Sequence, residues 1–272
     1  MSAAKRKTEK DLVVGLGATG LSIARYLKRN DVDAIFFDSR DEPPGRDELD
    51  ELWPDAEIIL GDVELPAGIR RVIASPGVAD SHPMLADARE EKLEVVSDIE
   101  LFARDAEKPF VVITGSNGKS TVTTLLYHMC LADGRETLAG GNLGEPALDL
   151  LDEEAPDVYV LELSSFQLHR TASLPAEVGV LLNVTPDHLD WHADEAEYRE
   201  AKYRIYADVD AAVVNRADVE AAKRAKHCGR VVSFGLDAPE NGQYGIREDE
   251  GEKFLAHGDV MLLSVRDLAL YG

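Results

Sequence analysis

The chain has 272 residues, with 29 Lys and Arg against 52 Asp and Glu, so its formal net charge is −23. That sign excludes a nucleic-acid clamp, because phosphate backbones are held by net-basic surfaces. With 44% hydrophobic residues, disorder is excluded as the dominant state. The two cysteines, Cys130 and Cys228, form no CxxC motif, and no apolar run reaches the roughly 18 residues of a membrane helix. We therefore expect a folded cytoplasmic protein without a membrane or nucleic-acid partner.

The first hundred residues alternate between apolar runs and amphipathic segments. We predict strands at residues 12–15, 34–38 and 72–75, and helices at 21–28 and 83–91. Such alternation is typical of a parallel sheet with crossover helices. Residues 1–106 are predicted to form a Rossmann-like domain of this kind.

A second α/β unit is predicted from residue 107 to residue 272. Its expected strands are 110–113, 158–162, 178–182 and 211–215, and its expected helices are 120–131 and 195–209. Short strands are expected around Phe234, Tyr244 and Phe254 and at 261–265. A Gly-rich turn directly after the first of these strands predicts a P-loop type of ATP-binding domain.

The first motif is Gly15-x-Gly17-x-x-Gly20, at a predicted strand-to-helix turn. Glycines there allow a tight turn and bring backbone N–H groups close to a phosphate. Asp38 ends the next strand, where such folds place an acid that binds a ribose. An NAD(P)-dependent oxidoreductase is one interpretation; glycines that serve only packing, or a pocket for another nucleotide, are the alternatives.

The second motif runs from Thr114 to Thr121, TGSNGKST. Inward N–H groups, a lysine for the terminal phosphates and a hydroxyl for Mg²⁺ together form a triphosphate cradle. Ile113 stands where the general Walker pattern has its first glycine. The predicted ATP-binding residues are Gly115, Ser116, Asn117, Gly118, Lys119, Ser120 and Thr121. Two nucleotide loops in one chain argue against a simple dehydrogenase.

Four further residues mean little individually, but two of them gain weight from their positions. Glu162 ends a predicted strand of the second unit and His188 lies just after another, at the edge where open α/β sheets bind ligands. Lys202 lies on a predicted helix, and Asn142 lies in a glycine-rich turn. Taken singly, such residues are usually solvated or capping.

Seven strings of the sequence resemble the Mur ligases. They are ASPG from Ala74, DIELF from Asp98, ITGSNGKSTVTTL from Ile113, GGNLGEPAL from Gly140, LELSSFQL from Leu161, LNVTPDHLD from Leu182 and YREAKYRIY from Tyr198. The similarity is greatest to members that add D-glutamate. It implies that the first domain binds a UDP-sugar rather than NAD. Ala18 and Ser39 depart from the family's pattern there.

The resemblance also implies residue roles. Substrate would be held by Thr19, Asp38, Ser39, Arg40, Ser75, Pro76, Gly77, Asn142 and His188. Catalytic roles would fall to Lys119, His188 and Lys202, and Mg²⁺ would be held by Ser120, Glu162, His188 and Lys202. An ammonium has no lone pair for a metal, so Lys202 would act as a carbamate.

The implied reaction is ATP-dependent: UDP-N-acetylmuramoyl-L-alanine is activated as an acyl phosphate and joined to D-glutamate in peptidoglycan synthesis. The family has a third, glutamate-binding domain, which we expect to be absent here. We therefore expect a truncated monomeric chain that binds UDP-MurNAc-L-alanine but does not complete ligation alone. A non-catalytic nucleotide-binding fragment remains an alternative.

Overall fold

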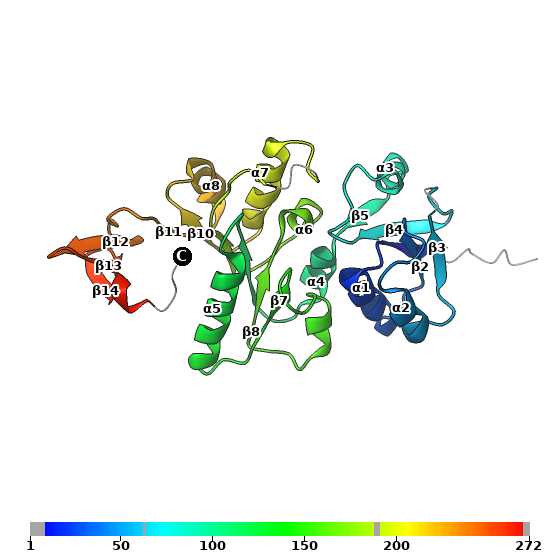
Figure 1. Cartoon of the computed structure of the whole chain (residues 1–272), viewed down its shortest axis with the longest axis horizontal. Coiled ribbons are helices and arrows are strands. Elements are labelled where there is room, and N and C mark those ends of the chain that lie inside the picture. Colours follow the sequence, from blue (N-terminus) through cyan, green and yellow to red (C-terminus); the bar gives the residue numbers. More distant parts are fainter. Residues whose placement is uncertain (1–8, 62–63, 188–190, 269–272) are drawn as a thin grey trace, which may run out of the picture.

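The computed structural model describes residues 9–61, 64–187 and 191–268. Two α/β units lie next to each other along the long axis, and a small antiparallel extension projects from the far end of the second unit (Figure 1). The predicted fold class is therefore confirmed. Within the described residues, no helix has both the length and the apolar character needed to cross a membrane.

The first unit is a five-stranded parallel sheet with the order β3-β2-β1-β4-β5. Its strands are β1 (Lys10–Val14), β2 (Ala34–Asp38), β3 (Glu57–Leu60), β4 (Ile69–Ala74) and β5 (Glu94–Val96), and its helices are α1 (Ala18–Arg29), α2 (Arg46–Leu52) and α3 (Pro83–Glu90). The strand order reverses between β1 and β4. Open α/β sheets bind ligands beyond the strand ends at such a point.

Alternation along the strands of the first unit produces two buried faces. Val13, Phe36 and Ile73 belong to one apolar cluster, which includes Leu27 of α1 and Leu49 of α2. The intervening strand residues form a second cluster with α3: Leu12, Val14, Ile35, Phe37, Val72, Met84 and Leu85. Burial on both faces explains why these strands are continuously apolar rather than alternating with polar residues.

The second unit contributes six parallel strands in the order β7-β8-β6-β9-β10-β11. These are β6 (Phe110–Thr114), β7 (Thr137–Gly141), β8 (Val158–Glu162), β9 (Val178–Leu181), β10 (Ala211–Asn215) and β11 (Arg230–Phe234), with helices α5 (Lys119–Ala132), α6 (Ser165–His169), α7 (Glu195–Tyr203) and α8 (Val219–Arg224). Its order reverses between β6 and β9, at the carboxyl end of the strand that precedes the predicted P-loop.

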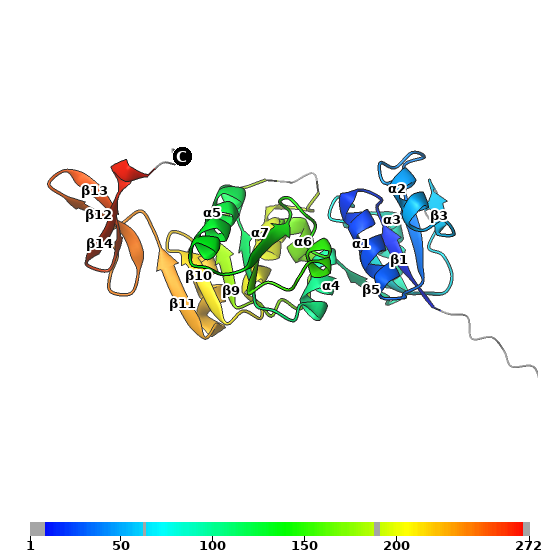
Figure 2. The ribbon, with the colours of Figure 1, turned by 90° about the horizontal axis from the view of Figure 1, so that it is seen from below.

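The extension is an antiparallel meander of β12 (Tyr244–Asp249), β13 (Glu252–His257) and β14 (Val260–Ser264). It joins β11 through one register pair, Phe234 with Tyr244. Seen from below, the meander stands away from the helices of the second unit (Figure 2).

Helix α4 (Asp98–Asp105) connects the two units and packs on α6. The Ser97 hydroxyl caps its first turn by accepting from the Glu100 N–H. Glu100, which is 2% exposed, accepts through Oε2 from the N–H groups of Ala172 and Ser173 at 2.7 and 2.9 Å. A buried carboxylate with charge-assisted hydrogen bonds thus ties the connecting helix to the segment after α6.

One expected helix is shorter than the sequence pattern predicts. The prediction of 195–209 is wrong at its end, because α7 stops at Tyr203 and a 3₁₀ turn follows at Arg204–Tyr206. Both Ile205 and Tyr206 are fully buried, and the tighter turn directs these adjacent residues inward before β10 begins. The Tyr206 hydroxyl then donates to the Val213 carbonyl on β10 at 2.9 Å.

Candidate functional site

The three glycines of the first motif have different structural duties. Gly15 has φ +97°, a conformation that disfavours other residues, and a Cβ there would lie 3.0 Å from the Ser75 Cβ. A Cβ on Gly20 would lie 2.0 Å from the Gly15 carbonyl oxygen. Around Gly17, by contrast, a Cβ would meet nothing within 4 Å. Packing therefore requires glycine at positions 15 and 20, whereas the space around Gly17 is open.

Both carboxylate oxygens of Asp38 accept hydrogen bonds from neighbouring residues of the chain. Its Oδ2 accepts from the Leu16 N–H at 2.7 Å and from Arg40 Nη2 at 2.7 Å. Its Oδ1 accepts from Arg40 N at 3.0 Å and from Arg40 Nε at 2.8 Å. Burial opposes the charged form, but the bonds from Arg40 and Leu16 prevail and lower the pKa of Asp38 to about 2. An acid held in this way is not arranged to receive the ribose hydroxyls of a dinucleotide.

A cavity of about 600 Å³ opens at the point where the order of the first sheet reverses. The second unit supplies part of its wall through Gly141, Asn142, Gly144, Pro146 and Gln167. The structure brings eight of the predicted substrate residues to this one cavity: Thr19, Asp38, Ser39, Arg40, Ser75, Pro76, Gly77 and Asn142. The ninth, His188, lies outside the described residues. Their individual roles stay predictions.

The second loop is held from the side by the chain segment after β9. Ser116 N–H donates to the Asn183 carbonyl at 3.0 Å, and Asn117 N–H donates to Asn183 Oδ1 at 2.9 Å. Gly118 adopts the left-handed conformation with φ +82° directly before α5. Lys119 Nζ donates to the Ser116 carbonyl at 3.2 Å. The loop therefore places a lysine and the free N–H groups of a helix start side by side, as anion binding requires.

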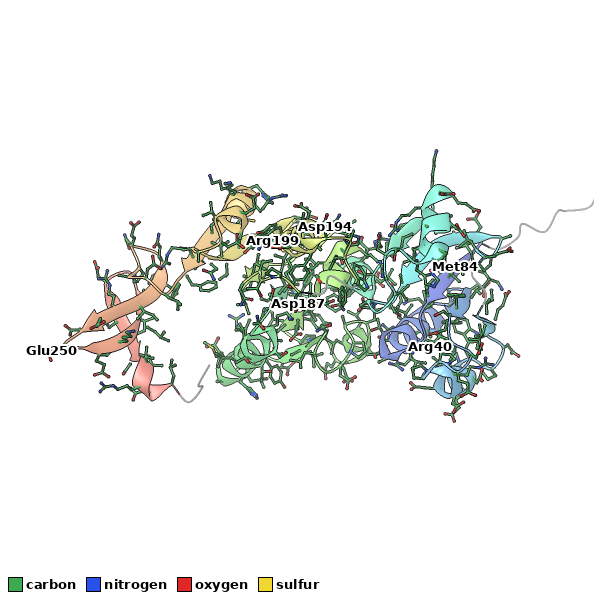
Figure 3. All side chains as sticks on the ribbon, turned by 45° about the horizontal axis from the view of Figure 1, so that its top comes forward. Arg40, Met84, Asp187, Asp194, Arg199 and Glu250 are labelled. Atoms are coloured by element: carbon green, nitrogen blue, oxygen red, sulfur yellow. The ribbon has the colours of Figure 1, made fainter. Side chains whose placement is uncertain are left out.

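Lys202 of α7 is buried directly behind this loop. Only 2% of it is exposed, and its Nζ donates to Thr114 Oγ1 at 3.3 Å and to the Gly115 carbonyl at 3.0 Å. Burial, followed by the charge of Lys119, lowers the pKa of Lys202 to about 7, against the opposing charges of Asp187 and Glu162. Three of the predicted site residues, Lys119, Glu162 and Lys202, thus belong to one electrostatic neighbourhood. Figure 3 shows Asp187 in the second unit and Arg40 in the first.

Asn142 connects the cavity to this neighbourhood. Its Nδ2 donates to Glu162 Oε1 at 2.8 Å, and its N–H donates to the Glu162 carbonyl at 2.8 Å. Gly141 makes the approach possible, because a Cβ there would lie 2.5 Å from the Glu162 carbonyl oxygen. The wall of the cavity therefore ends at the carboxylate beside the P-loop.

Glu162 also provides the best fit to a metal ion. It is 2% exposed, and its buried Oε2 has no hydrogen-bond partner among the residues that the structure describes. Such an oxygen is costly unless a ligand satisfies it. Ser120, the second residue of α5, is exposed. Among the described residues, no group of three His, Cys, Asp or Glu side chains could enclose a metal. Further oxygen ligands would therefore have to come from a phosphate, water or a modified side chain.

The structure adds site residues that the sequence analysis did not single out. Gln167 lines the cavity, accepts through Oε1 from the Ser164 N–H at 3.0 Å and donates through Nε2 to Asp98 Oδ2 at 3.1 Å. Burial raises the pKa of Asp98 to about 6 against the bond from Gln167. The pattern Ser164-x-x-Gln167 is a capping box and could have identified the start of α6. Nothing in the sequence pattern indicates that Arg170 and Trp191 also contact the cavity wall.

The fold and the site define an α/β protein with two glycine-rich strand-to-helix turns. The first turn borders the cavity, and the second follows the strand that pairs with Glu162, which Asn142 links to the cavity wall. Residues 113–265 match the Mur ligase middle domain, and residues 9–97 match the Mur ligase MurD-like N-terminal domain. Since the first match alone covers more than half of the chain, the chain belongs to the Mur ligase family. The oxidoreductase interpretation is not supported: the dinucleotide-type turn and Asp38 belong to a family of ligases.

Curated relatives are named UDP-N-acetylmuramoylalanine–D-glutamate ligase. The relative from Nitrosococcus oceani is 46% identical over 263 residues, which cover 96% of this chain and 58% of the relative. The relative from Legionella pneumophila (strain Paris) is 46% identical over 267 residues, which cover 96% of this chain and 60% of the relative. The chain thus spans about three fifths of the length of these relatives.

Solved structures share the fold. UDP-N-acetylmuramate-alanine ligase from Thermotoga maritima superposes with a TM-score of 0.52 at 20% identity, over 94% of this chain and 59% of that one. A UDP-N-acetylmuramate:L-alanyl-gamma-D-glutamyl-meso-diaminopimelate ligase from Neisseria meningitides gives 0.55 at 15% identity, over 92% and 84%. At these identities the likeness concerns the fold alone.

Proposed function

We propose that this chain supplies the nucleotide-sugar and ATP sites of an ATP-dependent ligase that joins D-glutamate to UDP-N-acetylmuramoyl-L-alanine. The observation that carries the proposal is the hydrogen bond from Asn142 to Glu162. It links the 600 Å³ cavity to the end of β8, which lies next to the strand that leads into the P-loop. A substrate bound in the cavity can thereby present its carboxylate to the terminal phosphate of ATP. Residues 1–106 and 107–272 are assigned as the two domains that meet at this point.

The first domain binds the UDP part in this proposal. The cavity is lined by Thr19, Ser39, Arg40, Ser75, Pro76 and Gly77 of this domain. Arg40 holds Asp38 in place and leaves 54% of its own side chain exposed. Since the protein's net charge is −23, local groups such as this guanidinium must offset repulsion of an anionic substrate.

The chemistry proceeds in two displacements. A carboxylate oxygen of the alanyl group attacks the γ-phosphorus of ATP, the bond to the bridging oxygen breaks, and ADP leaves. The amine of D-glutamate then attacks the carbonyl carbon of the acyl phosphate, loses a proton, and inorganic phosphate departs. Lys119 neutralises charge on the β- and γ-phosphates, Gly115 to Thr121 hold the phosphates, and Asn142 orients the reacting carboxylate; the contribution is positioning and charge stabilisation. His188 is assigned to the same step.

Mg²⁺ would be held by Ser120, Glu162, His188 and a carbamate on Lys202, and would neutralise phosphate charge. The buried, unpartnered Glu162 Oε2 supports that set. Lys202 supports it because its neighbours at hydrogen-bond distance are neutral oxygens of Thr114 and Gly115. Attack of the neutral amine on CO₂, with loss of one proton, would give a side chain with charge −1 and two oxygen ligands.

ATP and UDP-sugars are cytoplasmic metabolites, so we assign the protein to the cytoplasm. We also propose that it acts as a monomer. Titration calorimetry of the chain with UDP-MurNAc-L-alanine, and separately with Mg·ADP, tests the proposal. Both ligands are expected to bind, each without displacing the other. Binding of NADH in place of the UDP-sugar would overturn it. An assay of phosphate release with ATP, UDP-MurNAc-L-alanine and D-glutamate then distinguishes a catalytic chain from a non-catalytic nucleotide-binding one.

A further inference from the structure

The loop 75–80, which walls the cavity in the first unit, is held by side chains of the second unit. Arg170 directly follows α6 and donates to the Ser75 carbonyl through Nη1 at 3.2 Å and to the Val78 carbonyl through Nη2 at 2.5 Å. Its Nε donates to Asp80 Oδ1 at 3.2 Å. A single side chain thereby contacts three positions of a loop that lies 90 to 95 residues earlier in the sequence.

Burying the charged Arg170 side chain costs free energy of desolvation. Its side chain is 1% exposed, and burial lowers the pKa of its guanidinium even though Asp80 counteracts this. Burial likewise opposes the ionised form of Asp80, but hydrogen bonds from His169 and Arg89 and the charge of Arg170 lower the pKa of the carboxyl below its usual value. A buried arginine with a charged partner and two carbonyl acceptors is a fixed geometric element rather than a surface ion pair.

Trp191 makes a further contact to the same loop. Its Nε1 donates to the Pro76 carbonyl at 3.0 Å. The Arg170 guanidinium lies 5.0 Å from the Trp191 ring centroid, and Phe166 of α6 stacks on the ring with centroids 4.6 Å apart. The ring is therefore fixed by its neighbours before it meets the loop, and its single N–H is directed at one carbonyl.

These contacts determine where the N–H groups of the loop point. In a trans peptide the N–H lies opposite the preceding C=O. Since Pro76 and Val78 direct their carbonyls at Trp191 and Arg170, the N–H groups of Gly77 and Ala79 face away from the second unit's side chains. Both residues line the cavity, and neither N–H donates to an acceptor within the described residues. Two polarised donors are thus available to a ligand.

We propose that Arg170 and Trp191 are positioning residues for the nucleotide-sugar site: they orient the Gly77 and Ala79 N–H groups toward an anionic oxygen of the bound substrate. This inference rests on the proposed function of the cavity. Its consequence is that a residue pair of the ATP-binding unit determines affinity in the UDP-sugar site without touching the ligand. Neither side chain lines the cavity.

The test compares Trp191→Phe with Trp53→Phe in the full chain. Phenylalanine keeps one ring for the stack on Phe166 and removes the N–H that the Pro76 carbonyl accepts, together with the second ring of the indole. Trp53→Phe loses the same ring volume and therefore controls for it. Trp53 contacts Phe36 in the first unit, with centroids 5.6 Å apart, away from the cavity wall. Binding of UDP-MurNAc-L-alanine and of Mg·ADP is measured by calorimetry, and the melting temperature is measured alongside. We expect Trp191→Phe to weaken UDP-MurNAc-L-alanine about 5- to 10-fold, the scale of one lost hydrogen bond, with Mg·ADP affinity unchanged.

Arg170→Met provides a second variant, with Arg199→Met as its control. The Arg199 side chain is 37% exposed, against 1% for Arg170, and it pairs with Glu195 on α7. A loss of affinity of about 30-fold or more for the UDP-sugar, with Mg·ADP binding retained, supports the proposal, since the retained binding shows that the second unit is folded. Equal affinities for wild type, Trp191→Phe and a folded Arg170→Met would overturn it. If wild-type chain bound no UDP-sugar, the proposed function of the cavity would fail instead.

Discussion

The two glycine-rich loops differ in how the charges around them are balanced. Around the first loop, charge is balanced inside the protein: Asp38 accepts from Leu16 and Arg40, and the glycines serve close backbone packing. Around the second loop, Glu162 Oε2 has no hydrogen-bond partner within the described part of the chain, and Lys202 is buried against neutral oxygens. The difference indicates that close backbone packing constrains the first loop. Near the second loop, by contrast, buried ionisable side chains are left for a ligand to neutralise.

The largest expected effect breaks the geometry of the first loop. Gly20→Ala would put a Cβ 2.0 Å from the Gly15 carbonyl oxygen, and backbone cannot move aside as a side chain can. We expect a loss of about 3 kcal/mol in the free energy of unfolding, measured by urea denaturation. Gly17→Ala is the matched control, because its Cβ would meet nothing within 4 Å; its loss should stay below about 1 kcal/mol. Equal losses for both would contradict the packing argument.

A comparable change at the second loop should act on affinity rather than on stability. Lys119→Ala removes the ammonium whose Nζ lies 3.2 Å from the Ser116 carbonyl. We expect Mg·ADP affinity to fall about 10- to 100-fold, because a charged hydrogen bond to phosphate is lost, while UDP-MurNAc-L-alanine binding is kept. Calorimetry measures both, and the exposed Lys108→Ala serves as control. Unchanged Mg·ADP affinity would show that the loop binds no phosphate.

Sequence spacing was sufficient for the two glycine-rich turns and for Asp38 at the end of the second strand. The resemblance to the Mur ligases added Thr19, Ser39, Arg40 and Ser75 to Gly77, and these residues come together because parallel strands deliver them to one edge. Arg170 and Trp191 could not be predicted: their contacts to Ser75 and Pro76 span 95 and 115 residues. No local pattern encodes a contact between two units. Short elements such as α6 were missed because five residues carry too little periodicity.

A smaller effect concerns the pH dependence of stability. The pKa of Lys202 is about 7 in the folded chain, well below its usual value of 10.5, so between these values the unfolded chain binds the extra proton. Stability should therefore rise as pH increases from about 7 toward 10. Lys202→Gln removes the titration and keeps a donor for Thr114 and Gly115. In CO₂-free buffer we expect the variant to be more stable at pH 6 by about 2 kcal/mol, with the gap closing as pH rises. Parallel stability curves for the two proteins would argue against the lowered pKa.

The smallest effect tests whether the two loops serve one site. Asn142→Ala removes the donor to Glu162 Oε1 and alters the cavity wall supplied by the second unit, leaving Asp38 and Arg40 untouched. We expect affinity for UDP-MurNAc-L-alanine to fall about 10-fold and affinity for UDP alone to stay unchanged, because only the longer ligand carries a carboxylate to the P-loop edge. Calorimetry with both ligands measures the ratio. If both affinities fell together, Asn142 would contact the nucleotide itself, and the reacting carboxylate would have to lie elsewhere in the cavity.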